Sequence, residues 1–344
     1  MRSLDDINSR KIEHIDIVSR DKEVDRRKDY FGEIRLTHRA LPEVDLAKID
    51  TSTTFLGKKL SFPLLISCMT GGDHDEVRTI NFNLAKAAEA TGVAMGVGSQ
   101  RIMFTNPAAR KSFELRPFAP NALLFANLGA AQLNYGFTLD QCRDAVATLQ
   151  ADALCLHLNP LQEAVQPEGD TNFAGLAERI GQVAQNLGKP VIVKEIGAGI
   201  SLADARILVR QGISIIDVAG SGGTSWSRVE HHRRGGGSGD EIGLAFQDWG
   251  IPTPRALMNL KPLRDRVTLI ASGGIRSGID MAKGLVLGAS LCGIAAPFLK
   301  PAMESHEAVI ALIERLLREF RTAMFLLGVP SVDRLIGQEQ LIEG

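Results

Sequence analysis

Eight short apolar runs, spaced along the chain from Pro63 onward, constrain the fold of this sequence most strongly. Most of them are continuously apolar, which is typical of strands that are buried on both faces of a parallel sheet. Helical patterns lie between most of the runs, and strands that alternate with helices indicate βα units. The predicted strands are residues 63–68, 93–97, 122–127, 153–158, 190–194, 213–218, 267–271 and 290–295.

The intervening segments carry the start and stop signals of helices. Ser201 and Ser277 precede helical patterns as N-caps. Gly212 and Gly288 follow the same two patterns, where a glycine favours the left-handed end of a helix. The predicted helices cover residues 75–90, 138–150, 173–188, 201–211, 277–287 and, as one long amphipathic helix, 302–327.

Eight strands with these spacings predict an α/β protein with a closed (β/α)₈ (TIM) barrel, built as a single domain over residues 1–344. An open, doubly wound sheet is the alternative, but it would usually show fewer strands and one glycine-rich loop after its first strand. Polar residues follow almost every run, which favours the barrel. We expect an N-terminal extension over 1–62, the barrel over 63–300, a C-terminal helix and tail over 301–344, and a long loop after the sixth strand at 220–252.

The overall charge excludes some classes of function. The formal net charge is −1, which argues against a general binder of nucleic acid or of membrane surfaces. No run approaches the ~20 apolar residues that a membrane span needs, and the first residues lack the apolar stretch of a signal peptide. The four cysteines form no C-x-x-C pattern and are interpreted as small buried side chains in a reducing compartment. We therefore expect a soluble, cytoplasmic protein.

The ends of the last two predicted strands carry the most specific physical signal. Ser272-Gly273-Gly274 and Ala295-Ala296 follow them, and a helix begins nearby. Backbone N–H groups at such a place form the common phosphate site of barrels, and Arg276 could assist. This pattern indicates a phosphorylated ligand or cofactor without identifying it.

The end of the fourth predicted strand is also rich in polar groups. His157 and Asn159 alternate onto one face, Pro160 stops the strand, and Gln162 and Glu163 follow. A single histidine on an apolar strand is usually a core residue, but four polar groups within seven residues favour a site. One carboxylate beside phosphate groups is typical of Mg²⁺ binding.

Lys194 follows an apolar run and would be buried only beside a negative charge. Three interpretations stay open: a Schiff-base lysine, a cation that stabilises an anionic cofactor ring, or a structural ion pair with Glu195. Weaker signals follow the other strands, where a plain turn or a solvated charge is the alternative. Arg10 and Lys11, like residues 231–234, read by default as solvated helix faces.

Eight motifs occur in the order RKIEH, MTGG, GSQR, HLNPLQE, PVIVKE, GGTSW, DWGIPT and SGGIR. Together they resemble the type 2 isopentenyl diphosphate isomerases, which are flavin-dependent, over roughly Arg10 to Pro301. MTGG and HLNPLQE are distinctive, whereas SGGIR is shared with many FMN barrels, including hydroxy-acid oxidases.

The resemblance implies reduced FMN, Mg²⁺ and NADPH as the reductant, with isopentenyl and dimethylallyl diphosphate as substrates. It implies that Glu163 binds Mg²⁺ and that His157 and Gln162 support the reduced flavin in catalysis. The implied substrate contacts are Arg10, Lys11, Ser99, Gln100, Arg101, Asn159 and Gln162. The implied flavin contacts are Cys68, Met69, Thr70, Ser99, Asn127, Lys194, Thr224, Gly274, Ile275, Arg276, Ala295 and Ala296.

An allylic proton shift requires a strong, well-placed acid, because an unactivated alkene is a very weak base. The strand ends offer no carboxylate pair and no cysteine nucleophile for this task, which fits proton transfer by the reduced flavin itself. Arg10 and Lys11 are expected to belong to a lid that excludes water, and a homo-oligomer, tetramer or octamer, is expected. The rivals are an FMN oxidoreductase of the hydroxy-acid oxidase type, which needs a histidine base on a late loop, and a non-catalytic flavin or phosphate binder.

Overall fold

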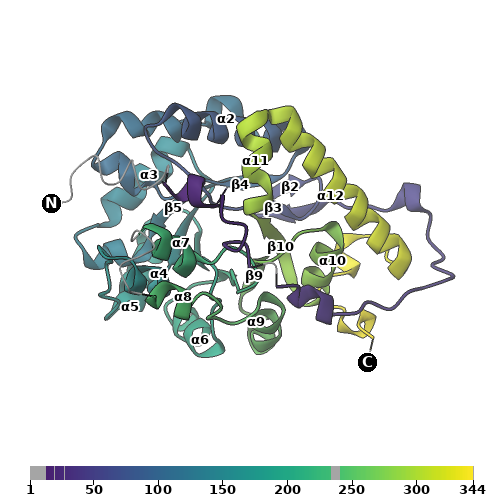
Figure 1. Cartoon of the computed structure of the whole chain (residues 1–344). Helices are drawn as coiled ribbons and strands as arrows, with labels where there is room; N and C mark the ends of the chain where they lie inside the picture. Colours follow the sequence, from purple (N-terminus) through teal and green to yellow (C-terminus); the bar gives the residue numbers. More distant parts are fainter. Residues whose placement is uncertain (1–12, 19, 27, 234–240, 344) are drawn as a thin grey trace.

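Eight parallel strands close into a barrel, as the sequence predicts (Figure 1). This computed structural model describes residues 13–18, 20–26, 28–233 and 241–343. The strands follow one another around the barrel in chain order, and the last pairs with the first. They are β3 (Leu64–Ile66), β4 (Ala94–Gly96), β5 (Leu124–Gly129), β6 (Ala153–Leu158), β7 (Val191–Glu195), β8 (Ile215–Asp217), β9 (Thr268–Ser272) and β10 (Ala289–Ile294).

The predicted helices surround the barrel, and their caps are confirmed. The hydroxyls of Ser201 and Ser277 accept hydrogen bonds from the N–H groups of Asp204 and Asp280. Gly212 and Gly288 adopt φ angles of 86° and 94°, in the left-handed region that favours glycine. The helices are α2 (Asp75–Thr91), α3 (Leu139–Leu149), α4 (Pro160–Val165), α5 (Leu176–Asn186), α6 (Leu202–Arg210), α7 (Trp226–Arg233), α8 (Ile242–Ala245), α9 (Thr253–Asn259) and α10 (Gly278–Val286).

The single helix predicted over 302–327 is wrong in one respect. The chain forms two helices here, α11 (Ala296–Glu304) and α12 (His306–Leu327), separated at Ser305. Ser305 is extended, with φ −168°, and its hydroxyl accepts a hydrogen bond from Ala308 N, so it caps α12. The apolar pattern continues through the break because both helices pack their buried faces on the same side of the barrel.

Side chains alternate along each strand, so every second residue points into the barrel. A buried apolar cluster fills the interior and includes Phe125, Cys155, Ile192, Ile215, Ile270 and Leu291. Two positions further along the same strands, the inward-facing residues become polar or small: they are Asn127, His157, Lys194, Asp217, Ser272 and Gly293. The barrel is therefore apolar in its middle and polar at the C-terminal ends of its strands.

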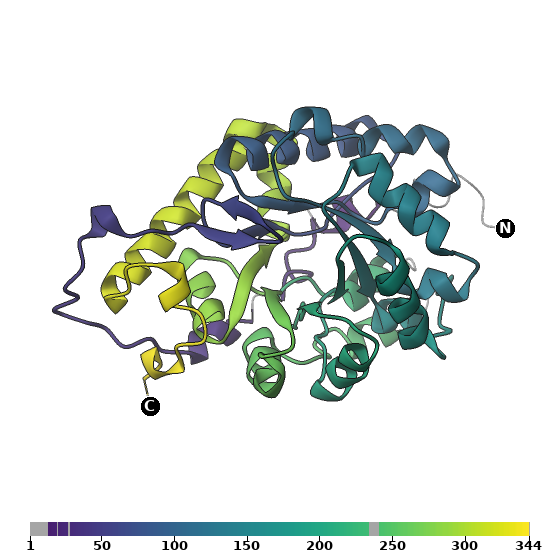
Figure 2. The same cartoon turned by 180° about the vertical axis from the view of Figure 1, so that it is seen from behind.

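The N-terminal extension contains a short hairpin that the sequence reasoning missed. Strands β1 (Thr53–Phe55) and β2 (Lys58–Leu60) pair in antiparallel fashion through Leu56 and Gly57, both of which have positive φ angles. Phe55 and Leu60 are buried against the interior cluster, and Lys58 Nζ donates to Ala122 O, just before β5. The hairpin therefore covers the N-terminal end of the barrel (Figure 2).

An N-terminal strap, residues 13–18 and 20–26, lies at the opposite end. Residues 13–18 are helical, and Asp25 forms an isolated bridge with Thr224 in the loop after β8. Arg26 donates to Gly197 O at 2.6 Å and to Thr224 O at 3.1 Å. These contacts hold the strap across the strand ends where the polar side chains lie (Figure 1).

Candidate active site

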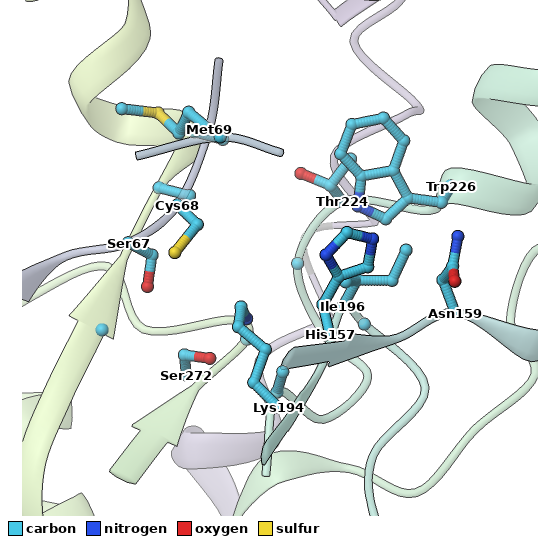
Figure 3. Close-up of a pocket in the computed structure, with 18 of the residues that line it drawn as sticks. Ser67, Cys68, Met69, His157, Asn159, Lys194, Ile196, Thr224, Trp226 and Ser272 are labelled. Carbon is cyan, nitrogen blue, oxygen red and sulfur yellow. The ribbon is translucent and has the colours of Figure 1, made fainter. Parts of the chain in front are cut away.

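A pocket opens at the C-terminal ends of the barrel strands and is lined by residues from the strap and from most of the strand ends. Figure 3 shows the side chains of Ser67, Cys68, Lys194 and Ser272 directed toward one another below the pocket, with His157 and Trp226 across from Met69. All of the predicted flavin contacts line this pocket. The fold therefore brings together predicted site residues that are more than 200 positions apart in the sequence.

Lys194 is buried in the pocket floor, and its counter-ion is Asp217. Lys194 Nζ lies 3.4 Å from Asp217 Oδ2 and donates to the carbonyl of Glu195 at 2.8 Å. The predicted alternative of an ion pair with the Glu195 carboxylate is wrong. That carboxylate instead accepts hydrogen bonds from the N–H groups that follow it, at Ile196, Gly197, Ala198 and Gly199.

The charge on Lys194 bears on its chemistry. Burial alone would lower the pKa of Lys194, but the negative charges around it, with Asp217 the largest contributor, together outweigh burial and raise the pKa above its usual value. A lysine that forms a Schiff base must lose its proton first, so this environment disfavours the Schiff-base interpretation. The site instead presents a fixed cation to whatever the pocket holds.

The opposite wall offers hydroxyls that lack partners. Ser67 Oγ and Thr70 Oγ1 are buried, line the pocket, and have no hydrogen-bond partner within the protein. Met69 and Ser99 lie beside them in the pocket lining. A buried polar atom without a partner is unfavourable, so this wall suits a ligand with polar edges.

The Cys68 thiol belongs to the same wall of the pocket. Its hydrogen bond with Cys155 and the charge of Lys194 lower the pKa of Cys68, against the effect of burial. The cysteines at 68, 142, 155 and 292 are free, as expected, but Cys68 is only partly buried and lines the pocket.

Glycines after β8 and β9 form a narrow cradle beside the pocket floor. Gly222, Gly273 and Gly274 have φ angles of 127°, 96° and 78°. A Cβ atom at Gly273 would lie 2.1 Å from Gly220 O, so the two loops approach more closely than any side chain would allow. Ile275, Ala295 and Ala296 complete the rim, and α11 begins there with its free N–H groups.

Arg276 lies at this cradle and contacts the strap. Its guanidinium donates to Asp25 Oδ1 and, at 3.2 Å, to Gly222 O. Asp25 was not predicted to approach the site, because nothing in the sequence places the N-terminal extension next to the loop that follows β9. The cradle offers backbone N–H groups and one arginine, which is the chemistry that binds phosphate.

Across the pocket, the polar residues at the end of β6 and directly after it form a hydrogen-bonded cluster. His157 Nδ1 lies 2.8 Å from Asn127 Oδ1. Asn159 donates to Gln162 Oε1 at 3.0 Å and to Glu163 Oε1 at 2.8 Å. Pro160 ends the strand and begins α4, which turns Gln162 and Glu163 toward the pocket.

Glu163 is buried, and its carboxylate also accepts a hydrogen bond from Asp170 N at 2.6 Å. The side-chain oxygens of Asn159 and Gln166 are buried without partners close to it. Among residues 13–18, 20–26, 28–233 and 241–343, no group of three or more His, Cys, Asp or Glu side chains could hold a metal ion. Any metal here would therefore rely on one carboxylate, amide oxygens and ligand atoms.

The side chains of Arg101 and Gln100, which both follow β4, lie in different surroundings. Arg101 lines the pocket and donates to Asp170 Oδ2 at 2.7 Å. Gln100 does not line the pocket: its amide donates to Ala145 O and accepts from Asn127 N. The chain turns into a 3₁₀ helix at this point, so we place Gln100 behind the site, where it supports Asn127.

Glu230 in α7 is a site residue that the sequence reasoning missed. Its carboxylate is fully buried and lies 3.1 Å from His14 Nε2, and Gln162 Nε2 donates to it at 2.7 Å. Burial would raise the pKa of Glu230, but His14, Arg233 and Gln162 lower it to about 2. Arg233 also pairs with Glu168, so the solvated face expected at 231–234 is wrong for Arg233.

Known proteins resemble the chain over nearly its whole length. A model of the FMN-dependent dehydrogenase family matches residues 6–118 and 134–343. An isopentenyl-diphosphate delta-isomerase of Hydrogenovibrio crunogenus is 54% identical over 98% of both chains. One of Paracoccus zeaxanthinifaciens is 54% identical over 98% of this chain and 97% of its own. The chain belongs to the isopentenyl-diphosphate delta-isomerase family.

Solved structures confirm the fold of this isopentenyl-diphosphate delta-isomerase family member. A flavocytochrome b2 variant superposes with a TM-score of 0.70 at 19% identity, covering 96% of this chain and 82% of that one. A mandelate oxidase variant superposes with a TM-score of 0.66 at 20% identity, covering 98% of both. At these identities the similarity concerns the fold alone.

Two further expectations concern the lid and membrane-spanning helices. Arg10 and Lys11 lie outside the described residues, so the lid expected there stays a prediction. In the described part of the chain, no helix is long and apolar enough to cross a membrane.

Proposed function

We propose that this protein interconverts isopentenyl diphosphate and dimethylallyl diphosphate by an allylic 1,3-proton shift, with reduced FMN as acid and base, in isoprenoid biosynthesis. The observation that carries the proposal is the 54% identity, over nearly the full length, to relatives named isopentenyl-diphosphate delta-isomerase. The pocket supports it, because a phosphate cradle and a fixed cation face a cluster of amide and imidazole groups.

The residues present fit FMN. Its phosphate would lie at Thr224, Gly274, Ile275, Arg276, Ala295 and Ala296, and its ring between the wall of Cys68, Met69 and Thr70 and the groups Ser99, Asn127 and Lys194. The unpartnered hydroxyls of Ser67 and Thr70 support this placement, because the polar ring edges would supply their missing hydrogen bonds. When bound, reduced FMN supplies the proton donor and acceptor of the shift.

The residues also fit Mg²⁺. Glu163 offers a carboxylate, and the unpartnered oxygens of Asn159 and Gln166 lie beside it. Oxygen ligands of this kind, completed by water and phosphate oxygens, are those that Mg²⁺ prefers. We propose that Glu163 is the protein ligand and that the metal joins it to the substrate diphosphate.

The substrate is held by charge at one end and oriented at the other. Arg101, Ser99, Arg10 and Lys11 would bind the diphosphate, and Arg101 is already oriented by Asp170. Asn159 would line the same pocket beside His157 and Gln162. Asn127 orients the His157 ring, and Glu230 orients the Gln162 amide, so both present a fixed polar atom to the hydrocarbon.

The strap excludes water from this pocket. His14, Ile15 and Val18 line its mouth, and the His14 ring packs edge-on against Trp226 at a centroid distance of 5.2 Å. Exclusion matters because water would quench a carbocation formed from the substrate. Arg10 and Lys11 would extend the same cover as a lid.

The reductant, the location and the oligomeric state also belong to the proposal. We propose NADPH as the reductant of the flavin, a cytoplasmic location, and a homo-oligomer, either tetramer or octamer. The partners are the two small diphosphates, and the near-neutral net charge of −1 supports no nucleic-acid role.

An FMN-dependent oxidoreductase of the hydroxy-acid oxidase type is the alternative. The chain shares its fold with flavocytochrome b2 and mandelate oxidase at 19–20% identity, which concerns the fold and not the reaction. Such an enzyme needs a base, typically a histidine on a late loop. Here, within the described residues, the pocket histidines are His14 from the strap and His157 from β6, and the loops after β9 and β10 supply glycine, alanine and Arg276.

The experiment supplies purified holoenzyme anaerobically with NADPH, Mg²⁺ and either isopentenyl diphosphate or a panel of 2-hydroxy acids. Dimethylallyl diphosphate should form from the first substrate, and no 2-hydroxy acid should reduce the flavin. Glu163→Gln should retain FMN and need a much higher Mg²⁺ concentration for turnover. Flavin reduction by a hydroxy acid, without isomerisation of the diphosphate, would replace the proposal by the alternative.

A further inference from the structure

Lys194 and Asp217 form a buried ion pair at the floor of the pocket. They are register partners in the parallel pairing of β7 with β8, so their side chains leave the sheet next to each other on the same face. Each lies two positions beyond an isoleucine of the apolar interior, Ile192 and Ile215. Lys194 is 6% exposed and Asp217 is 1% exposed, so water does not stabilise either charge.

The Asp217 carboxylate is held in place from both sides. Its Oδ1 atom accepts hydrogen bonds from Ser272 Oγ at 2.6 Å and from Ala219 N at 3.2 Å. Its Oδ2 atom faces Lys194 Nζ at 3.4 Å. Ser272 comes from β9 and directly precedes the phosphate cradle, and Figure 3 shows it beside Lys194 below the cavity.

Among the described residues that face Lys194, Asp217 raises its pKa the most. The titratable groups that face Lys194 are Asp217 from β8, Glu195 from β7 itself, and the thiols of Cys68 after β3 and Cys155 in β6. The Glu195 carboxylate is occupied by the backbone N–H groups that follow it. Removal of the Asp217 charge would therefore leave the buried Lys194 ammonium group next to two thiols and to the Glu195 carboxylate, which is already hydrogen-bonded to the backbone.

We propose that Asp217 is a positioning residue that keeps Lys194 protonated while the flavin is oxidised, so that the cation is in place before the ring gains its charge. The inference rests on the proposed placement of FMN beside Lys194. An oxidised flavin ring is neutral and offers a buried ammonium no compensation, whereas an anionic reduced ring does. With Asp217 present, reduction takes two electrons and one proton to give the anionic ring, and Lys194 binds no further proton.

The test is Asp217→Asn in the holoenzyme. Asparagine keeps the size of the side chain and can still accept from Ser272, but it removes the charge. Burial should then deprotonate Lys194 while the flavin is oxidised, and reduction should bind one more proton than in the native enzyme. The midpoint potential should therefore fall more steeply with pH than in the native enzyme. The slope should increase by about 30 mV per pH unit, because one additional proton per two electrons shifts the potential by that amount for each tenfold change in proton concentration.

Proton uptake is measured with an indicator dye during anaerobic photoreduction in weakly buffered solution, and the potential is measured against pH. Asp152→Asn is the matched control, because Asp152 pairs with Lys58 and Arg116 near the start of β5, at the N-terminal end of the barrel. It should keep the native proton uptake. Ser272→Ala, which removes one support of Asp217, should give a smaller increase in slope.

Unchanged proton uptake in Asp217→Asn with FMN bound would overturn the proposal. If that variant does not retain FMN, Ser272→Ala decides, and a native slope there overturns it. Lys194→Met separates this inference from the placement of the flavin. A native potential in Lys194→Met would show that Lys194 is not beside the ring, and the proposed site would then be wrong instead.

Discussion

Glu230 joins three parts of the molecule through one buried carboxylate. His14 reaches it from the strap, Gln162 from α4 and Arg233 from α7 itself. A buried carboxylate is tolerated only when its partners offset the loss of hydration, and here they lower its pKa from the usual 4.5 to about 2. The same bonds orient the Gln162 amide, so the stability of this corner and the geometry of the site depend on one residue.

Glu230→Gln should lower the free energy of unfolding by about 3 kcal/mol at neutral pH, because it leaves buried partners without their counter-charge. Since the folded pKa is depressed, the stabilisation is fully present above the unfolded value and is lost as pH falls through the folded value. The difference between the native protein and the variant should therefore shrink as the pH falls below about 5.5.

Urea unfolding of both proteins at several pH values measures this difference. Glu13→Gln is the control, because Glu13 contacts the same Arg233 from an exposed position and should change stability little. A difference that does not shrink as the pH falls below about 5 would contradict the assignment of Glu230 as a stabilising anion.

The loops after β8 and β9 act as one element, because each fills the space that a side chain on the other would need. Gly222 and Gly274 are also in contact: a Cβ atom on Gly274 would lie 3.1 Å from the Gly222 carbonyl carbon. Their backbone N–H groups can face a phosphate only while the loops keep this close approach. The phosphate site therefore depends on the absence of side chains as much as on the presence of Arg276.

Gly273→Ala should weaken FMN binding at least about tenfold, because the new methyl group would push Gly220 away. Gly212→Ala is the matched control: its φ angle of 86° imposes similar backbone strain, but nothing lies within 4 Å of the added atom. Titration of the apoproteins with FMN, followed by flavin fluorescence, measures both affinities. Equal weakening in the two variants would show that strain alone, and not the contact between the loops, is responsible.

The barrel strands could be predicted because strands buried on both faces appear as continuous apolar runs. The β1–β2 hairpin was missed because its strands have three residues each and expose polar side chains. The partner of Lys194 was missed because Asp217 lies 23 positions later, and only the register of β7 with β8 brings the two together. Glu230 was missed because its helix is highly charged and lies in a segment interpreted as a loop.

The apolar residues that stabilise the fold and the polar residues of the site lie at different heights along the barrel axis. The hairpin closes the N-terminal end with Phe55 and Leu60, and the interior above it is apolar. The C-terminal end carries the charged and amide groups, and the strap lies across it. We infer that a flavin barrel, similar in fold to oxidases, here serves a reaction with no net transfer of electrons.

The most direct test counts electrons per product. Holoenzyme is photoreduced anaerobically without NADPH, and isopentenyl diphosphate and Mg²⁺ are added while the flavin spectrum is recorded. We expect many molecules of dimethylallyl diphosphate per flavin, with the flavin still reduced at the end. Formation of at most one product per flavin, with the flavin becoming oxidised as product appears, would contradict this inference and indicate an oxidoreductase.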